Sequence, residues 1–326
     1  MEDKIFSVTD RNFEAVAIEI FHFQYQTNQV YRSWVDTLGI DPVTIDTTGK
    51  IPFLPISFFK THKVVSTSFD PVAVFESSGT TGSVSSKHYL KSLDLYQKSF
   101  LLGFEYFYGK PDQYAILGLL PSYLERENSS LIVMVDSLIK KSKHPYSGFY
   151  LNEHEKLEKT LLHLSRHEQP VILIGVTFAL LDFAENRQLK LQHTNVIETG
   201  GMKGRRDELT RTEVHHILKK KLGVPLVQSE YGMTELLSQA YAKKDGVFQT
   251  SPWMKIMLRD EEDPLSLKQS DSGKPTRGVL NIIDLANLYS CSFIASDDLG
   301  TISTEGFTVD GRLDQSELRG CSLLSI

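Results

Sequence analysis

Cysteine is scarce in this sequence, which has only Cys291 and Cys321 among its 326 residues. Two cysteines cannot build the disulfide framework of a small secreted domain, and these two lack the paired spacing of a zinc site. No apolar run approaches the roughly 18 residues of a membrane span, and the N-terminal stretch MEDKIF lacks the apolar core of a signal peptide. We therefore expect a cytoplasmic protein that is neither exported nor inserted into a membrane.

Positive charge is not in excess either, because 35 Lys and Arg stand against 41 Asp and Glu, for a formal net charge of −6. Short basic clusters at 140–143 and 203–206 do not predict a basic face, so we expect no nucleic-acid partner. What the sequence does have is a 40% hydrophobic composition and enough length for a sizeable core, in one large domain or two ordinary ones.

Helical periodicity alternates with short apolar runs along the chain. After Asp10, a possible N-cap, apolar residues at helical spacing predict an amphipathic helix: Phe13, Val16, Ala17, Ile20 and Phe21. The same pattern predicts helices over 93–107, 154–168 and 208–223. Four short apolar segments are typical of buried strands in a parallel sheet: 114–121, 170–177, 194–201 and 225–232.

This alternation predicts an α/β sheet with helices on both faces. Segment 278–314 has β-rich runs separated by Gly and Asp turns, which predict a small antiparallel subdomain. We therefore expect an α/β core over 1–275, with an N-terminal helical region over about 1–70, and a β-rich subdomain over 276–326.

The stretch FESSGTTGSVSSKHY (75–89) is too polar for a core and too rich in Gly for a regular element, so it predicts a loop leaving a strand. Backbone N–H groups, hydroxyls and one cation suit a polyphosphate. A flexible surface linker has the same composition. The spacing from Gly79 and from Gly82 fails the Walker A pattern, which excludes an ordinary P-loop nucleotide hydrolase.

Other polar stretches follow predicted strands, where the ligands of an α/β sheet gather. SSGTTG (77–82) with Lys87, YGMTE (231–235), SDDLG (296–300) and GRLD (311–314) resemble, in order and rough spacing, the motifs of the adenylate-forming superfamily, which includes acyl-CoA synthetases and luciferases. YGMTE matches the family pattern Y-G-x-T-E at every fixed position. The resemblance implies a multi-layer α/β adenylation fold, with parallel-rich sheets flanked by helices, that uses ATP and Mg²⁺.

The resemblance also implies which residues act on the phosphates. A loop and Lys87 would hold the β- and γ-phosphates; the loop residues are Ser78, Gly79, Thr80, Thr81 and Gly82. Thr234 would hydrogen-bond the α-phosphate, and Glu235 would hold the Mg²⁺ that neutralises it.

The nucleoside would contact a second set of residues, again by resemblance: Tyr231, Gly232, Gly200, Gly201, Asp298 and Arg312. Tyr231 would stack on adenine, and the glycine pair would line the other face of the ring. Asp298 would accept hydrogen bonds from both ribose hydroxyls, and Arg312 would donate to the same sugar. Ser296 and Asp297 stand where the family has Thr and Gly, which leaves the choice of aspartate open.

A narrower resemblance is to the LuxE-type acyl-protein synthetases, the fatty-acid-activating component of bacterial luminescence reductase complexes. They are similarly short, lack the C-terminal mobile domain of the superfamily, and end in a Gly-Cys pair. Here the ending is ELRGCSLLSI, so the resemblance implies that Cys321 accepts the acyl group as a thioester. As a free cysteine, Cys321 could instead be a small buried hydrophobe, which is what we expect of Cys291.

Three functions stay open. The favoured one is ATP-dependent activation of a carboxylic acid, expected to be a fatty acid, to an acyl adenylate, followed by transfer to Cys321 and then to a partner protein. An AMP-forming CoA ligase would keep the first step and change the acceptor. A non-catalytic protein would bind the nucleotide or acyl adenylate without turning it over.

Other candidates have simpler interpretations. His215 and His216 have no carboxylate at triad or metal spacing and predict a solvated helix face. Phe178 predicts an apolar helix face, although the superfamily often places an acyl-pocket wall there. Segment 122–130 could line that pocket or be a polar loop.

Overall fold

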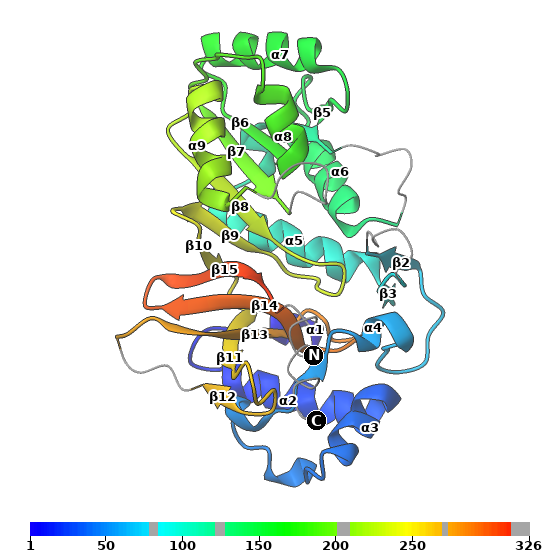
Figure 1. Cartoon of the computed structure of the whole chain (residues 1–326). Helices are drawn as coiled ribbons and strands as arrows, with labels where there is room; N and C mark the ends of the chain where they lie inside the picture. The colour runs from blue at the N-terminus through cyan, green and yellow to red at the C-terminus, as the bar shows by residue number, and fades with distance from the viewer. Residues whose placement is uncertain (78–83, 121–127, 201–208, 269–272, 314–326) are drawn as a thin grey trace.

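The computed structural model describes residues 1–77, 84–120, 128–200, 209–268 and 273–313. Its strands are ordered β12-β11-β13-β14-β15-β10-β9-β8-β7-β6-β4-β5 in one large sheet, with β1 (Leu54–Pro55) added beside β14. The sheet runs along the long axis of the molecule (Figure 1). Within the described ranges, no helix is long and apolar enough to span a membrane.

The half of the sheet that lies at the top of Figure 1, called the upper half, consists of parallel strands, as the sequence predicts. Its strands β4 (Ala115–Leu119), β6 (Val171–Val176), β7 (Thr194–Thr199) and β8 (Val227–Tyr231) pair in parallel, with the short β5 (Gly148–Phe149) at the edge. Every residue of β4, β6 and β8 is buried, which explains their near-continuous apolar sequences. The four predicted strands are confirmed.

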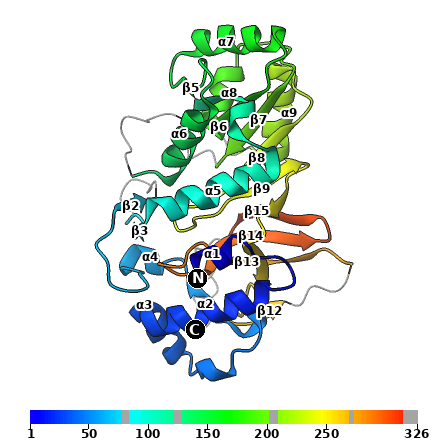
Figure 2. The same ribbon diagram turned by 180° about the vertical axis from the view of Figure 1, so that it is seen from behind.

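Helices cover both faces of this parallel half. The helices are α5 (Leu93–Tyr108), α6 (Ser130–Ser142), α7 (His154–Arg166), α8 (Thr177–Ala184) and α9 (Arg211–Leu222), with a 3-10 turn η3 (Pro111–Gln113). In the front view α8 and α9 lie before the sheet, and in the rear view α5 and α6 do (Figures 1 and 2). The predicted α/β architecture and its three helices are therefore confirmed.

The lower half of the sheet is antiparallel. It consists of β11 (Met254–Arg259), β12 (Leu267–Lys268), β13 (Thr276–Asp284), β14 (Phe293–Ser303) and β15 (Gly306–Arg312), and β9 (Ala240–Lys244) and β10 (Val247–Thr250) connect it to β8. The antiparallel pairing predicted for 278–314 is confirmed. Strand β11 pairs with β13 along six positions, so part of the sequence before 276 shares this sheet, and the division into two domains stays a prediction.

The N-terminal helices pack against the lower half. They are α1 (Glu2–Ile5), α2 (Phe13–Thr27), α3 (Gln29–Thr37) and α4 (Phe58–Thr61), with 3-10 turns η1 (Pro42–Thr44) and η2 (Thr48–Lys50). All five apolar residues predicted for α2 are buried. The prediction of Asp10 as its cap is wrong, because the helix begins at Phe13 and its N-cap is Asn12. The Asn12 side chain instead accepts a hydrogen bond from the backbone N–H of Thr9 at 2.7 Å.

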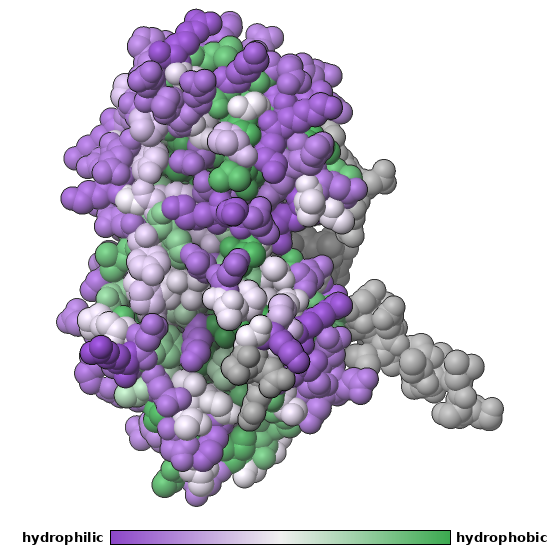
Figure 3. Space-filling view, turned by 90° about the vertical axis from the view of Figure 1, so that its left-hand side faces the viewer, coloured by the Kyte–Doolittle hydropathy of each residue, from purple (hydrophilic) through white to green (hydrophobic). Residues whose placement is uncertain are grey.

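A separate hairpin of β2 (Ala73–Glu76) and β3 (Lys87–Leu90) stands beside the start of α5. The segment between its strands contains the predicted phosphate loop, and positions 78–83 of that loop lie outside the described residues. The strand predicted to lead into the loop is present as β2. On the face shown in Figure 3, apolar side chains are scattered among hydrophilic ones and form no single continuous patch.

Candidate functional site

The base of the β2–β3 hairpin brings Ser77, Ser86 and Lys87 together. The backbone N–H of Ser86 donates to Ser77 Oγ at 2.9 Å, and that of Ser77 donates to the Ser86 carbonyl at 3.1 Å. Lys87 pairs with Glu76 across the strands at 3.4 Å, and both side chains are more than a third exposed. Since an exposed pair contributes at most about 1 kcal/mol, Lys87 can readily exchange this partner for another anion. The predicted Ser78–Gly82 contacts lie outside the described residues.

Glu235 lies against this hairpin although it comes from the loop after β8. Its side chain is buried, and burial raises the pKa of its carboxyl above the usual range. A hydrogen bond with the Ser86 side chain and the positive charges of Arg312 and Lys60 act in the opposite direction. A buried carboxyl group thus faces positive charge at the base of the predicted phosphate loop.

The backbone around Thr234 and Glu235 is held by three buried side chains that the sequence analysis missed. His88 Nδ1 lies 2.9 Å from the Thr234 carbonyl oxygen, and Asn287 Nδ2 donates to the Glu235 carbonyl at 2.7 Å. Asp284 accepts hydrogen bonds from the next part of the loop, the backbone N–H groups of residues 237 and 238, both at 2.9 Å. The only sequence signal for Asp284 and Asn287 is that they interrupt the apolar run IIDLANL.

Tyr231, Asp298 and Arg312 form a second contact group across the sheet. The Tyr231 hydroxyl donates to Asp298 Oδ2 at 2.7 Å, and Arg312 Nε donates to Asp298 Oδ1 at 3.0 Å. Asp298 and Arg312 are direct cross-strand partners on β14 and β15. Asp298 is buried, whereas the Arg312 side chain is 80% exposed. The structure therefore joins Asp298 by hydrogen bonds to two predicted nucleoside-binding residues, Tyr231 and Arg312.

The Tyr231 ring itself is buried. It packs edge-on against Phe248 and Phe307, with ring centroids 5.9 and 5.8 Å away. Burial first, and then the charge of Asp298, raise the pKa of the Tyr231 hydroxyl well above its usual value, so the hydroxyl stays a donor. Its predicted stacking on adenine stays a prediction.

The predicted glycines lie at the ends of β7 and β8. Gly200 is exposed with φ of +73°, and Gly201 lies outside the described residues. A Cβ at Gly232 would meet Glu230 Oε1 at 2.5 Å, so a side chain there would displace a buried carboxyl. The left-handed backbone conformation at 200 therefore favours glycine.

Comparison with known sequences decides the family of the chain. The family described as "Acyl-protein synthetase, LuxE" matches residues 7–325. The chain belongs to the LuxE acyl-protein synthetase family. The predicted family is thereby confirmed. No sequence among the curated proteins matches this LuxE-family chain.

Three solved structures are similar to the LuxE-family chain at low identity. O-succinylbenzoate coenzyme A synthetase (MenE) from Bacillus subtilis, in complex with ATP and magnesium ion, is 17% identical, with a TM-score of 0.48, over 72% of this chain and 49% of that one. A holo four-domain nonribosomal peptide synthetase bound to AMP and glycine is 12% identical, with a TM-score of 0.46, over 84% and 20%. A red-emitting luciferase from Phrixothrix hirtus is 13% identical, with a TM-score of 0.42, over 84% and 48%. The chain thus spans half or less of the length of each of these proteins.

The LuxE-family chain also contains a buried polar cluster centred on Glu198 of β7. Thr177 Oγ1 donates to Glu198 Oε2 at 2.6 Å and also contacts the Gly200 carbonyl. Ser229 Oγ donates to Glu198 Oε1 at 3.1 Å, and Arg211 Nε lies 3.5 Å from the same oxygen. The cluster ties the backbone at Gly200 to α8, β8 and α9.

His215 belongs to this cluster, so its predicted place on a solvated helix face is wrong. Its ring is buried on the sheet side of α9, and its Nε2 lies 3.2 Å from Ser229 Oγ and 4.0 Å from Glu198 Oε1. Burial lowers its pKa to about 4. Serine and carboxylate both approach Nε2, whereas a catalytic triad needs them on opposite ring nitrogens. His216 is exposed, as predicted.

The remaining candidates are simpler. Cys291 is fully buried, its thiol contacts the Phe293 carbonyl at 3.4 Å, and burial raises its pKa to about 12, which confirms its place in the core. Phe178 is buried on α8, as the apolar-face interpretation predicts. Cys321 and residues 122–127 lie outside the described residues.

Proposed function

We propose that this chain uses ATP to activate a fatty acid as an acyl adenylate, and then transfers the acyl group to Cys321 as a thioester for a partner protein. The observation that carries the proposal is the meeting of motifs that are far apart in the sequence. The hairpin with Lys87 touches the Thr234–Glu235 loop, and Tyr231 of the same motif touches Asp298 and Arg312.

In the first step, a carboxylate oxygen of the acid attacks the α-phosphorus of ATP. The bond from that phosphorus to the β-phosphate oxygen breaks, and pyrophosphate leaves with the electron pair. We propose that Lys87 balances charge on the leaving phosphates and that Thr234 hydrogen-bonds the α-phosphate. Asp298 and Arg312 would hold the ribose, and the Tyr231 ring would contact adenine beside Gly200, Gly201 and Gly232.

The same site fits a magnesium ion bound together with the nucleotide. Among the described residues, no group of three or more His, Cys, Asp or Glu side chains could hold a metal by itself. Magnesium bound with a nucleotide takes most of its ligands from phosphates and water and needs one or two carboxylates. Glu235 would provide one, and the ion would neutralise the phosphate charge that builds up during attack.

In the second step, the thiolate of Cys321 attacks the acyl carbonyl carbon, the bond to the AMP oxygen breaks, and AMP leaves. The thiol proton passes to solvent. The thioester keeps the acyl group activated for transfer to a further protein. We further propose that the chain acts in the cytoplasm, where its thiols stay reduced.

The test is to incubate the protein with ATP, Mg²⁺ and a radiolabelled fatty acid. The proposal expects pyrophosphate exchange into ATP and a hydroxylamine-labile acyl-protein. Cys321→Ser should keep the exchange and lose the acyl-protein, because a serine hydroxyl stays protonated at neutral pH and attacks poorly. Acyl-CoA formation without acyl-protein, on adding coenzyme A, would replace this function with a CoA ligase. Absence of exchange with acids of every chain length would leave a binding protein.

A further inference from the structure

The β2–β3 hairpin and the loop after β8 come from distant parts of the chain and are joined by His88. Its Nδ1 lies 2.9 Å from the Thr234 carbonyl oxygen, a contact between residues 146 positions apart. We propose that His88 is a positioning residue that fixes Thr234 and Glu235 relative to Lys87. The consequence for catalysis rests on the function proposed above, whereas the structural link does not.

Lys87 and His88 are neighbours in strand β3, and their side chains point to opposite faces of the hairpin. Successive side chains of a strand point to opposite faces. Lys87 is exposed, and His88 is buried and stands opposite Phe75 of β2. One strand therefore presents a cation where the phosphates are expected and sends the next side chain inward to the Thr234 backbone. The position of the cation is thus coupled to that of the loop.

The His88 ring can act only as a donor in this contact. A carbonyl oxygen only accepts hydrogen bonds, so Nδ1 must carry the hydrogen. Burial lowers the pKa of His88 to about 4, so the ring is neutral at neutral pH and has one N–H group. Phe59 packs edge-on against the ring, with centroids 5.9 Å apart. A neutral, buried ring with one donor is suited to holding a backbone group in place.

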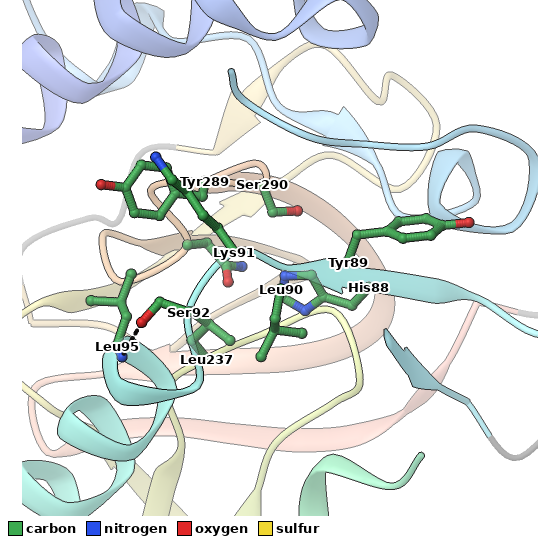
Figure 4. A pocket seen from close by; sticks show the side chains of 10 residues that line it. His88, Tyr89, Leu90, Lys91, Ser92, Leu95, Leu237, Tyr289 and Ser290 are labelled. Atoms are coloured by element: carbon green, nitrogen blue, oxygen red, sulfur yellow. Dashed lines mark hydrogen bonds between the residues drawn. The ribbon is translucent and has the colours of Figure 1, made fainter. Parts of the chain in front are cut away.

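The surroundings of the His88 ring include the start of α5. His88 lines a small pocket with Lys91, Leu237, Tyr289 and other residues of β3, α5 and the turn after β13 (Figure 4). In this pocket the Lys91 ammonium lies 4.0 Å from the centroid of the Tyr289 ring. The pocket thus brings the His88 ring of the hairpin together with Leu237 of the loop after β8.

The other end of the loop is anchored elsewhere. Asp284, the last residue of β13, holds the backbone of 237 and 238, and Asn287, in the turn after β13, holds the Glu235 carbonyl. Without His88 the loop would keep these anchors, but its position relative to the hairpin would no longer be fixed by the contact with the Thr234 carbonyl. A displacement of about 1 Å at a catalytic group can cost about 100-fold in rate. The loss should therefore fall on kcat more than on the KM for ATP.

The test compares three variants that differ in the position of a hydrogen-bond donor. His88→Asn keeps an amide near the Nδ1 position, His88→Gln places it near the Nε2 position, and His88→Leu removes it. Leu161→Ala on α7 is the control for general destabilisation, because it opens a cavity in the upper half far from the hairpin (Figure 1). Two measurements are made: hydrogen–deuterium exchange of the 229–240 backbone without nucleotide, and kcat and KM for pyrophosphate exchange.

The proposal expects faster deuterium exchange over 229–240 in the His88→Leu and His88→Gln variants and a near-parental deuterium exchange rate in His88→Asn. It expects no change over 229–240 in Leu161→Ala. It expects kcat for pyrophosphate exchange to fall about 100-fold in His88→Leu and His88→Gln, and to stay within about tenfold of the parental value in His88→Asn. Equal effects of Asn, Gln and Leu on both measurements would overturn it, as would parental values in all three. If the parent protein shows no pyrophosphate exchange, the proposed function fails, and the deuterium pattern alone then decides whether His88 positions the loop.

Discussion

Glu235 has the environment expected of a residue that binds a cation during turnover. Its buried carboxyl has a raised pKa, and the nearby positive charges only partly offset the effect of burial. A bound Mg²⁺ would favour the ionised form. In the fold without ligands this buried group is costly, which is common where function and stability compete.

Glu235→Gln should lower kcat for pyrophosphate exchange about 100-fold, since a lost contact to the metal removes about 3 kcal/mol of transition-state stabilisation. The melting temperature should not fall, because the amide replaces a carboxyl that burial already disfavours in its charged form. Steady-state kinetics and a thermal melt measure both effects. Parental rates of pyrophosphate exchange would contradict the proposal that Glu235 binds the metal.

Glu230 lies next to Tyr231 and titrates unusually. Burial, with a smaller contribution from the charge of Glu198, raises its pKa to about 7, against an opposing hydrogen bond from Thr199. A carboxyl whose folded pKa exceeds its unfolded pKa stabilises the fold less as pH rises between the two values. Glu230 should therefore destabilise the protein progressively from about pH 4.5 to about pH 7 and by a constant amount above.

Glu230→Gln should raise the free energy of unfolding at pH 8 by at most about 3 kcal/mol, because 2.5 pH units correspond to about 3.4 kcal/mol and the new amide must still fit. At pH 4.5 the gain should vanish. Urea denaturation at the two pH values measures it, with the exposed Glu105→Gln on α5 as the control. An equal gain at both pH values would show that ionisation of Glu230 is not the cause.

At the scale of elements, the loop after β8 depends on the end of β13. Asp284 is fully buried and accepts hydrogen bonds from two backbone N–H groups of that loop and from the Ser238 hydroxyl, the last at 2.6 Å. The loop that carries Thr234 and Glu235 is therefore shaped by a strand of the antiparallel half.

Asp284→Asn should destabilise the protein by about 1–3 kcal/mol, because its amide group brings a donor to a position surrounded by donors. The rate of pyrophosphate exchange should fall as well, because the same loop carries Glu235. The matched control is Asp245→Asn in the β9–β10 turn, where the side chain is 72% exposed and a change within 0.5 kcal/mol is the usual result for a surface site. Equal denaturation midpoints for the two variants would contradict this dependence.

The difference between local sequence patterns and contacts made by the fold explains which elements and site residues the sequence could predict. Strands β4, β6, β7 and β8 were predictable because parallel strands buried on both faces have continuous apolar sequences. Strands β9 to β12 were missed, and β10 takes one of its partners from a distant part of the chain, since Phe248 of β10 pairs with Phe307 of β15. Motif order brought out Glu235 and Asp298. The buried roles of His88 and His215 had no sequence signal, because only the fold shows which polar groups lie next to these side chains.

At the scale of the whole molecule, the sheet is continuous from its parallel half into its antiparallel half through β8, β9, β10 and β15. The contact of Tyr231 with Asp298 lies across this junction. Heat should therefore disrupt both halves together, because neither can lose its strands without exposing the pairing edge of the other. Differential scanning calorimetry should record one endotherm whose calorimetric and van't Hoff enthalpies agree. Two resolved endotherms would mean that the halves unfold as separate cooperative units, joined by hydrogen bonds that break before either core melts.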